Sequence, residues 1–240
     1  MNMKKTLLIG ALAFVLSACV KPTESIRFSI LGDSFSAMEG TVYPDSNDVW
    51  YVHEPTISTD VTLTEQMWWY KVARETGWTL DRNNSFSGSL ICNFWGYNAG
   101  PYYSPHSFLR RMDDLGNPDV IFVFGGTNDV HNGAYCGDYV YFEWTEGQLE
   151  CYRPALACLF DNLKRSYPRA KLYFLVDMGL YDYDSNGERF VESVQRIARR
   201  CDVECIELYG IEKMYGHPNK SGQAAIAGQV IEALSADFSF

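Results

Sequence analysis

Residues 119–126 read Asp-Val-Ile-Phe-Val-Phe-Gly-Gly, and this stretch decides the fold. The run between Asp119 and the glycines is entirely apolar, without the polar–apolar alternation expected of a strand that has one face in water. Such a run is typical of a strand in a parallel sheet, where helices cover both faces. The glycine pair predicts the end of the strand. We therefore expect a buried, central parallel strand here.

Similar apolar runs alternate with amphipathic segments along the rest of the chain. Further strands are expected at residues 27–31, 78–81, 171–176 and 203–208. Helices are expected at residues 64–75, 105–115, 146–167, 188–200 and 221–235, and the third of these is alternatively a pair that restarts at Pro154. Alternating strands and helices predict an α/β fold, a three-layer α/β/α sandwich with about five parallel strands, as in flavodoxin-like proteins. Residues 26–240 are expected to form it as a single domain.

Composition limits the class of protein and the kinds of partner. With 240 residues, of which 47% are hydrophobic, the chain can bury a core, and intrinsic disorder is excluded as its main state. The net charge of −10 repels phosphate backbones, so a nucleic-acid partner is not expected. The cysteines and histidines lack the spacing of a zinc site, and neither a metal nor another cofactor is expected. The sequence leaves the oligomeric state open.

Residues 1–18 have the features of a signal peptide. Two lysines precede an apolar run at 7–16, which is too short to span a bilayer as a permanent helix. The segment ends in Leu-Ser-Ala-Cys19, which resembles the lipobox of bacterial lipoproteins. That resemblance implies acyl chains on Cys19, a tether over residues 19–25 and a membrane attachment in the cell envelope, and Val20 in place of Asp favours the outer membrane. An ordinary secretory signal is the alternative, and the pairing of the remaining cysteines stays open.

Short polar motifs follow the predicted strands. Gly-Asp-Ser34 comes after the first strand, Gly-Thr-Asn128-Asp after the central strand and His217-Pro after the last, with Gly88 in the loop between the first two. Catalytic groups in such sheets lie beyond the carboxyl ends of the strands, so these motifs are expected to meet at one edge. Ester hydrolysis needs a nucleophile, a base and donors for the oxyanion, and Ser34, His217 and Asn128 have these chemistries. Less specific roles stay open: a helix N-cap for Ser34, and turn residues for Asn128 and Gly88.

These four blocks, in this order over residues 27–235, resemble the SGNH or GDSL-type hydrolase superfamily. The resemblance implies a serine esterase that hydrolyses carboxylic esters, with Ser34 as nucleophile and His217 as base. It also implies an oxyanion hole built from the Ser34 amide, the Gly88 amide and the Asn128 side chain.

The sequence departs from that family at the acid expected three residues before the histidine, where Met214 stands. Methionine can neither orient nor charge-stabilise an imidazole. Glu212, the nearest upstream carboxylate, is the candidate acid of a triad. Two alternatives stay open: a backbone carbonyl as orienter, which gives a Ser–His dyad, or an acid from elsewhere, such as Asp182 or Asp184. Asp33 is expected to hold the turn of the nucleophile.

Aromatic residues in the loops indicate the class of ester. Trp50, Tyr51, Trp95 and Tyr97 are expected to line the site, and aromatic faces over a polar cleft suit sugar rings. The sequence therefore favours O-deacetylation of a carbohydrate, on a glycan or a smaller ester. Two alternatives stay open: a lipase or lysophospholipase-type esterase on the same fold, and a non-catalytic glycan-binding lipoprotein, which the replacement of the acid by Met214 favours.

Overall fold

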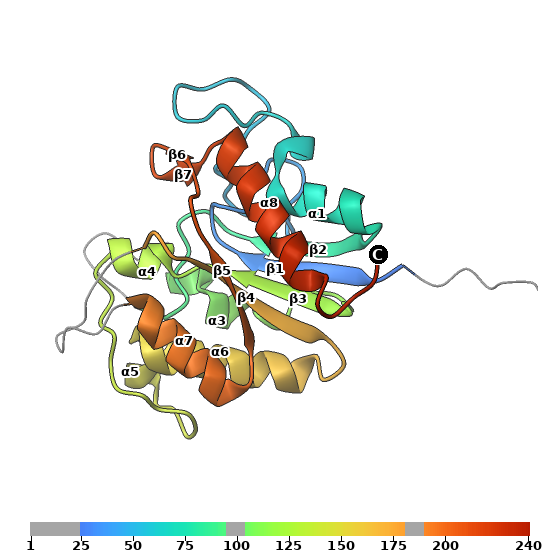
Figure 1. Ribbon diagram of the computed structural model, residues 1–240. Coiled ribbons are helices and arrows are strands. Elements are labelled where there is room, and N and C mark those ends of the chain that lie inside the picture. Colours follow the sequence, from blue (N-terminus) through green and yellow to red (C-terminus); the bar gives the residue numbers. More distant parts are fainter. Residues whose placement is uncertain (1–24, 95–103, 181–189) are drawn as a thin grey trace, which may run out of the picture.

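The computed structural model describes residues 25–94, 104–180 and 190–240. A five-stranded sheet lies at its centre, with strand order β2-β1-β3-β4-β5 and every neighbouring pair parallel (Figure 1). The strands are β1 (Arg27–Gly32), β2 (Thr79–Ser85), β3 (Val120–Phe124), β4 (Lys171–Asp177) and β5 (Glu204–Leu208). This arrangement confirms the predicted α/β fold. The expected signal peptide, tether and Cys19, together with Trp95, Tyr97, Asp182 and Asp184, lie outside the described residues.

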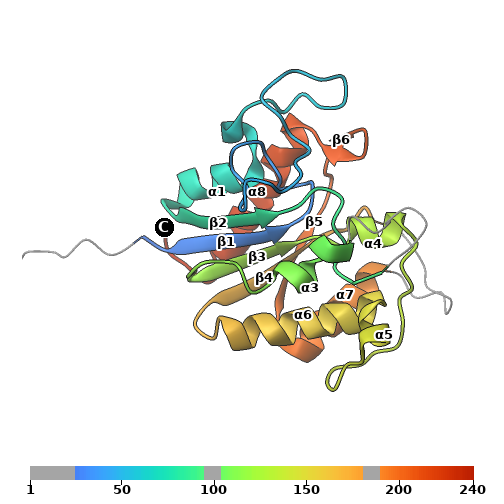
Figure 2. The ribbon, with the colours of Figure 1, turned by 180° about the vertical axis from the view of Figure 1, so that it is seen from behind.

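Helices cover both faces of the sheet (Figures 1 and 2). One face is covered by α1 (Trp68–Thr76) and α8 (Lys220–Leu234), and the other by α3 (Phe108–Arg111), α6 (Tyr152–Ser166) and α7 (Phe190–Cys201). Phe122 in β3 belongs to the core on the α1 and α8 side, whereas its neighbour Val123 belongs to the core on the α6 and α7 side. Both faces of β3 are therefore buried, which explains why its apolar run has no alternation.

Shorter elements connect these layers. They are the 3₁₀ turns η1 (Thr64–Gln66) and η2 (Ser104–His106), the helices α4 (Thr127–His131) and α5 (Glu146–Leu149), and the hairpin strands β6 (Lys213–Met214) and β7 (His217–Pro218). The helix predicted at 64–75 is two elements, because Met67 has an extended backbone between η1 and α1. The helix predicted at 105–115 is only η2 and α3, and the segment 146–167 forms the pair α5 and α6. Within the described ranges, no helix combines the length and the apolar character needed to cross a membrane.

The strand predicted at 78–81 continues further than its composition indicates. Asn83 and Asn84 are polar, yet both are buried within β2. The Asn83 side-chain amide donates to the Ser36 carbonyl (3.0 Å), and that of Asn84 donates to the Asp114 carbonyl (3.0 Å). Hydrogen bonds to distant segments satisfy these side chains, so the strand extends to Ser85.

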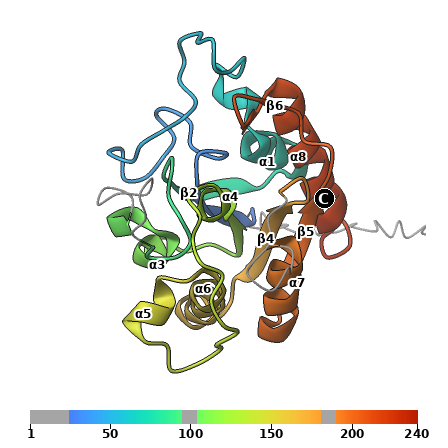
Figure 3. The same ribbon diagram turned by 90° about the vertical axis from the view of Figure 1, so that its left-hand side faces the viewer.

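The carboxyl ends of the strands gather at one edge of the sheet, which Figure 3 faces. Because β1 lies between β2 and β3, the turn after β1 lies between the loops that follow those two strands. The segment after β5 carries the β6–β7 hairpin on this side of the molecule, and α4 lies here as well (Figure 3). Segments far apart in the sequence therefore meet at this edge.

A glycine allows α8 to pack closely on the segment that carries the hairpin. A Cβ on Gly222 would lie 2.2 Å from the Glu212 carbonyl oxygen, whereas Gly228 in the same helix is exposed, with no described atom within 4 Å of such a Cβ. Gly222→Ala is expected to lower the melting temperature, because backbone atoms must shift. Gly228→Ala is expected to raise it, since alanine is favoured over glycine in a helix by about 1 kcal/mol. Thermal unfolding checks the pair, and equal stability of the two variants would contradict the close packing.

Candidate active site

Ser34 lies on a tight turn at the carboxyl end of β1. The Asp33 carbonyl accepts a hydrogen bond from the Ser36 amide (3.2 Å), and the Ser34 carbonyl accepts one from the Ala37 amide (3.3 Å). The Asp33 carboxyl group accepts from the Phe35 amide (3.0 Å), so Asp33 holds the turn as the sequence predicts. No helix of the described chain begins at this turn, which excludes the N-cap role for Ser34.

The imidazole of His217 meets the Ser34 hydroxyl across a sequence separation of 183 residues. His217 Nε2 lies 2.9 Å from Ser34 Oγ, and His217 Nδ1 lies 3.0 Å from the Tyr215 carbonyl oxygen. Because a carbonyl oxygen only accepts, Nδ1 carries the hydrogen and Nε2 is left to accept a hydrogen bond from the hydroxyl. Burial is the main cause that lowers the pKa of His217, to about 4. The imidazole is therefore neutral at pH 7 and can take up a proton.

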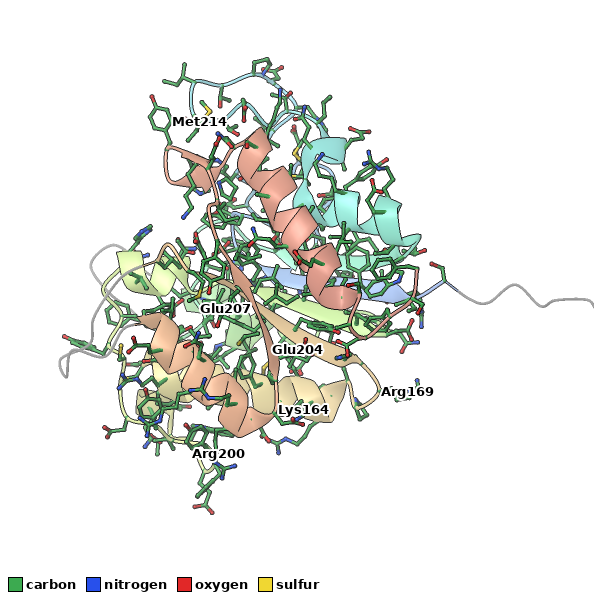
Figure 4. The ribbon with its side chains drawn as sticks, in the orientation of Figure 1. Lys164, Arg169, Arg200, Glu204, Glu207 and Met214 are labelled. Atoms are coloured by element: carbon green, nitrogen blue, oxygen red, sulfur yellow. The ribbon has the colours of Figure 1, made fainter. Side chains whose placement is uncertain are left out.

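A two-residue hairpin turn sets the orientation of the imidazole. Met214 pairs with His217 across the β6–β7 ladder, and Figure 4 shows Met214 on this hairpin. Between them, Tyr215 and Gly216 both have positive φ, at 47° and 78°. Two successive positive φ angles are the signature of a type I′ turn. The turn brings the Tyr215 carbonyl against Nδ1, so a backbone group orients the ring.

The expectation that Glu212 orients the imidazole is wrong. The Tyr215 carbonyl occupies the position at Nδ1, and the Glu212 carboxylate lies 3.5 Å from the side-chain amide of Asn219. The Glu212 carbonyl also accepts a hydrogen bond from the Asn219 backbone amide (3.1 Å), which holds Glu212 beside the start of α8. The sequence sets the spacing between Glu212 and His217 but not the direction of the side chain.

Tyr51 holds the backbone next to His217. Its hydroxyl donates to the Pro218 carbonyl (2.8 Å) and accepts from the side-chain amide of Gln223 (3.0 Å). The same Gln223 amide donates to the Phe35 carbonyl (3.1 Å), which ties the hairpin to the turn of the nucleophile. Since Tyr51 is 0% exposed, the expectation that it lines the substrate site is wrong.

Trp50 lies at the site, against the histidine. Its indole ring stacks on the imidazole of His217, with the ring centroids 3.5 Å apart and the planes within 8° of parallel. The ring of Phe35 meets the same imidazole edge-on, at 5.6 Å between centroids. One face of the indole, expected from the sequence to meet a sugar, is therefore covered by His217.

Asn128 lies in the first turn of α4 and bonds to the loop that carries Gly88. The Asn128 side-chain amide donates to the Ser89 carbonyl (3.0 Å), which uses one of its two hydrogens. Gly88 has a φ of 81°, a backbone that favours glycine. The buried Asp129 carboxyl group accepts from the Ile91 amide (2.9 Å) and so holds the same loop against α4. The structure thus brings α4, with Asn128, against the loop that carries Gly88, and the resemblance implies a role in the oxyanion hole for both residues.

Arg111 joins the loop that carries Gly88 (the glycine loop) to the turn of the nucleophile. No sequence motif marks Arg111 as part of the site. Its guanidinium donates to the Gly32 carbonyl (3.1 Å) and to the Ser89 hydroxyl (2.9 Å). Burial lowers the pKa of Arg111 to about 9 and raises the pKa of Asp33 to about 7, and the charge of each favours the ionised form of the other. Asp33 Oδ2 has no hydrogen-bond partner within the part of the chain that the structure describes. Two ionisable side chains, Asp33 and Arg111, are therefore buried beneath the site.

Known proteins show the same fold. The family model of the GDSL-like Lipase/Acylhydrolase family matches residues 26–234. No curated protein sequence matches the chain. A structure described as a GDSL-like lipase, from Bacteroides ovatus ATCC 8483, is 44% identical, with a TM-score of 0.82 over 88% of this chain and 99% of that one. Another, from Bacteroides uniformis ATCC 8492, is 40% identical, with a TM-score of 0.81 over 88% of this chain and 96% of that one.

A more distant likeness concerns the fold alone. A family two carbohydrate esterase from Clostridium thermocellum, in complex with cellohexaose, is 15% identical, with a TM-score of 0.57 over 90% of this chain and 65% of that one. The family match and the two Bacteroides structures cover nearly all of the described sheet and its helices. The chain therefore belongs to the GDSL-like lipase/acylhydrolase family of hydrolases.

Proposed function

We propose that this chain is a serine esterase in which Ser34 and His217 act as a dyad. The observation that carries the proposal is the 2.9 Å contact between Ser34 Oγ and His217 Nε2. The neutral imidazole accepts the hydroxyl proton while Oγ attacks the ester carbonyl carbon. The proton then passes from Nε2 to the departing alcohol, which leaves the acyl group on Ser34. Water, deprotonated by the same imidazole, releases the carboxylic acid and restores the serine.

The oxyanion formed in each step needs hydrogen-bond donors. The proposed donors are the Ser34 amide, the Gly88 amide and the second hydrogen of the Asn128 side-chain amide. The bond from Asn128 to Ser89 and the contacts of Arg111 support this assignment, because they hold the Gly88 loop against α4 and against Gly32 at the end of β1. A donor of this kind typically contributes about 2.7–4 kcal/mol to stabilisation of the transition state.

We propose that the ester is an O-acetyl group on a carbohydrate. Tyr215, next to His217 at the tip of the hairpin, is 66% exposed, and an exposed aromatic ring suits the face of a sugar. The net charge of −10 favours a neutral substrate over a polyanionic one. The Clostridium thermocellum carbohydrate esterase shares the fold, which is compatible with this chemistry. The two Bacteroides relatives are described as lipases, so a long-chain ester is the second candidate.

Replacing the nucleophile tests the mechanism. Ser34→Ala is expected to abolish hydrolysis of an aryl acetate with little change in melting temperature, because it removes the attacking oxygen alone. A fluorophosphonate probe should label the wild-type protein and not this variant. Ser235→Ala, at an exposed position beyond α8, is the control and should keep full activity and labelling. A wild-type protein that is inactive and unlabelled would instead support a non-catalytic glycan-binding role.

Glu212→Gln separates a dyad from a triad. Because the Glu212 carboxylate lies at Asn219 and not at the imidazole, this variant is expected to keep kcat close to the wild-type value. His217→Ala removes the base and should lower kcat as far as Ser34→Ala does. Replacing a triad acid by its amide lowers kcat by about 10⁴-fold. Steady-state kinetics on an aryl acetate distinguishes the dyad from the triad. A loss of about 10⁴-fold in kcat for Glu212→Gln would show that Glu212 acts as the triad acid.

The substrate is tested with two series of esters. Aryl acetate is expected to have a higher kcat/KM than aryl octanoate, and acetate should be released from O-acetylated oligosaccharides. Tyr215→Asn keeps a residue that tolerates positive φ and removes the aromatic ring. It should raise KM for the oligosaccharide far more than KM for aryl acetate, because the proposed contact of the ring is with the sugar and the backbone carbonyl at Nδ1 is kept. A preference for octanoate would assign the lipase-type activity.

A further inference from the structure

The imidazole of His217 is restrained on its face as well as at its nitrogens. Trp50 stacks on it at 3.5 Å between ring centroids, with the planes 8° apart. Phe35 meets it edge-on, and Ser34 and the Tyr215 carbonyl contact the two nitrogens. Rotation of the ring out of line with the serine would break the stack and both polar contacts.

Backbone hydrogen bonds determine where the indole lies. The amides of Trp50 and Tyr51 both donate to the Ala37 carbonyl, at 3.3 and 3.1 Å. The Ala37 amide donates to the Ser34 carbonyl (3.3 Å), so the indole is anchored to the turn of the nucleophile. The hydroxyl of Tyr51 bonds to the carbonyl of the residue after His217. Two consecutive residues thus hold the ring of His217 and the backbone that follows it.

The imidazole becomes a cation when it takes the serine proton, and its described surroundings disfavour that charge. Burial lowers the pKa of His217 most, Lys213 and His131 lower it further, and the Tyr215 carbonyl raises it. The Asp177 carboxylate forms an ion pair with Lys213. The face of an indole ring attracts a cation that lies within about 6 Å of its centroid. Trp50 is positioned to stabilise the imidazolium through this interaction.

We propose that Trp50 is a positioning residue for His217 and that its indole face takes over part of the role of a triad acid, since no carboxylate of the described residues contacts this imidazole. The indole fixes the plane of the imidazole and stabilises its protonated form, and it does so without a formal charge. This inference rests on the proposed Ser–His mechanism. The role it gives Trp50 is to position His217, not to bind the substrate.

Two variants of Trp50 test the proposal on an aryl acetate, which carries no sugar. The order of kcat is expected to be Trp, then Phe, then Leu, with a roughly 3- to 30-fold loss for Trp50→Leu and little change in KM. Phenylalanine rescues part of the loss because it keeps an aromatic face. Trp78→Leu is the matched control, because Trp78 precedes the amino end of β2, away from the carboxyl ends of the strands, and packs on Phe28 and Phe238. It should lower the melting temperature without changing kcat.

Equal kcat values in the wild-type, Trp50→Phe and Trp50→Leu proteins would overturn the proposal. A higher KM for an acetylated oligosaccharide with unchanged kcat would also overturn it, since that is the signature of a sugar-binding face. If Trp50→Leu does not fold, Trp50→Phe still decides, because a kcat equal to that of the wild-type protein contradicts the proposal. Failure of the serine-esterase mechanism is a separate result: the wild-type protein itself would be inactive and unlabelled by the fluorophosphonate.

Discussion

The hydrogen bond between Ser34 Oγ and His217 Nε2 is the interaction on which the rest of the site depends. Its partners follow β1 and β5, which are separated in the sheet by β3 and β4. The β6–β7 hairpin bridges that distance. The Lys213–Asp177 ion pair fixes it to the end of β4, and Tyr51 fixes it to the segment after the nucleophile. Because each anchor comes from a different element, the position of the imidazole depends on the assembly of the whole sheet edge.

Charged groups are buried beneath this edge, although burial of charge costs stability unless hydrogen bonds compensate. Arg111 is compensated by the Gly32 carbonyl and the Ser89 hydroxyl, and Asp129 by amides of the glycine loop. Asp33 is compensated at one oxygen, and burial raises the pKa of its carboxyl group to about 7. These groups connect the turn of the nucleophile to the Gly88 loop and to α4, which carry proposed oxyanion donors.

A histidine held by uncharged groups differs electrostatically from one held by a carboxylate. A carboxylate favours the imidazolium and raises its pKa, whereas here burial keeps the pKa of His217 at about 4. The Tyr215 carbonyl fixes the tautomer, and the Trp50 ring fixes the plane. The type I′ turn makes this possible, because it directs a backbone carbonyl at Nδ1 while Met214 serves as the ladder partner of His217.

Local patterns in the sequence determined the layers of the fold, the ends of β1, β3, β4 and β5 and the residues that meet there, because apolar runs and turn residues act between neighbours along the chain. Tertiary structure alone decided which groups surround the histidine. Glu212 is close to His217 in sequence but is held at Asn219. Tyr51 is buried and its hydroxyl donates a hydrogen bond to Pro218, 167 residues away in the sequence. Arg111 donates one to Gly32, 79 residues away. The polar end of β2 is a strand because Asn83 and Asn84 bond to distant segments of the chain. Side-chain direction and long-range hydrogen bonds depend on how distant segments pack, and no short stretch of sequence contains that information.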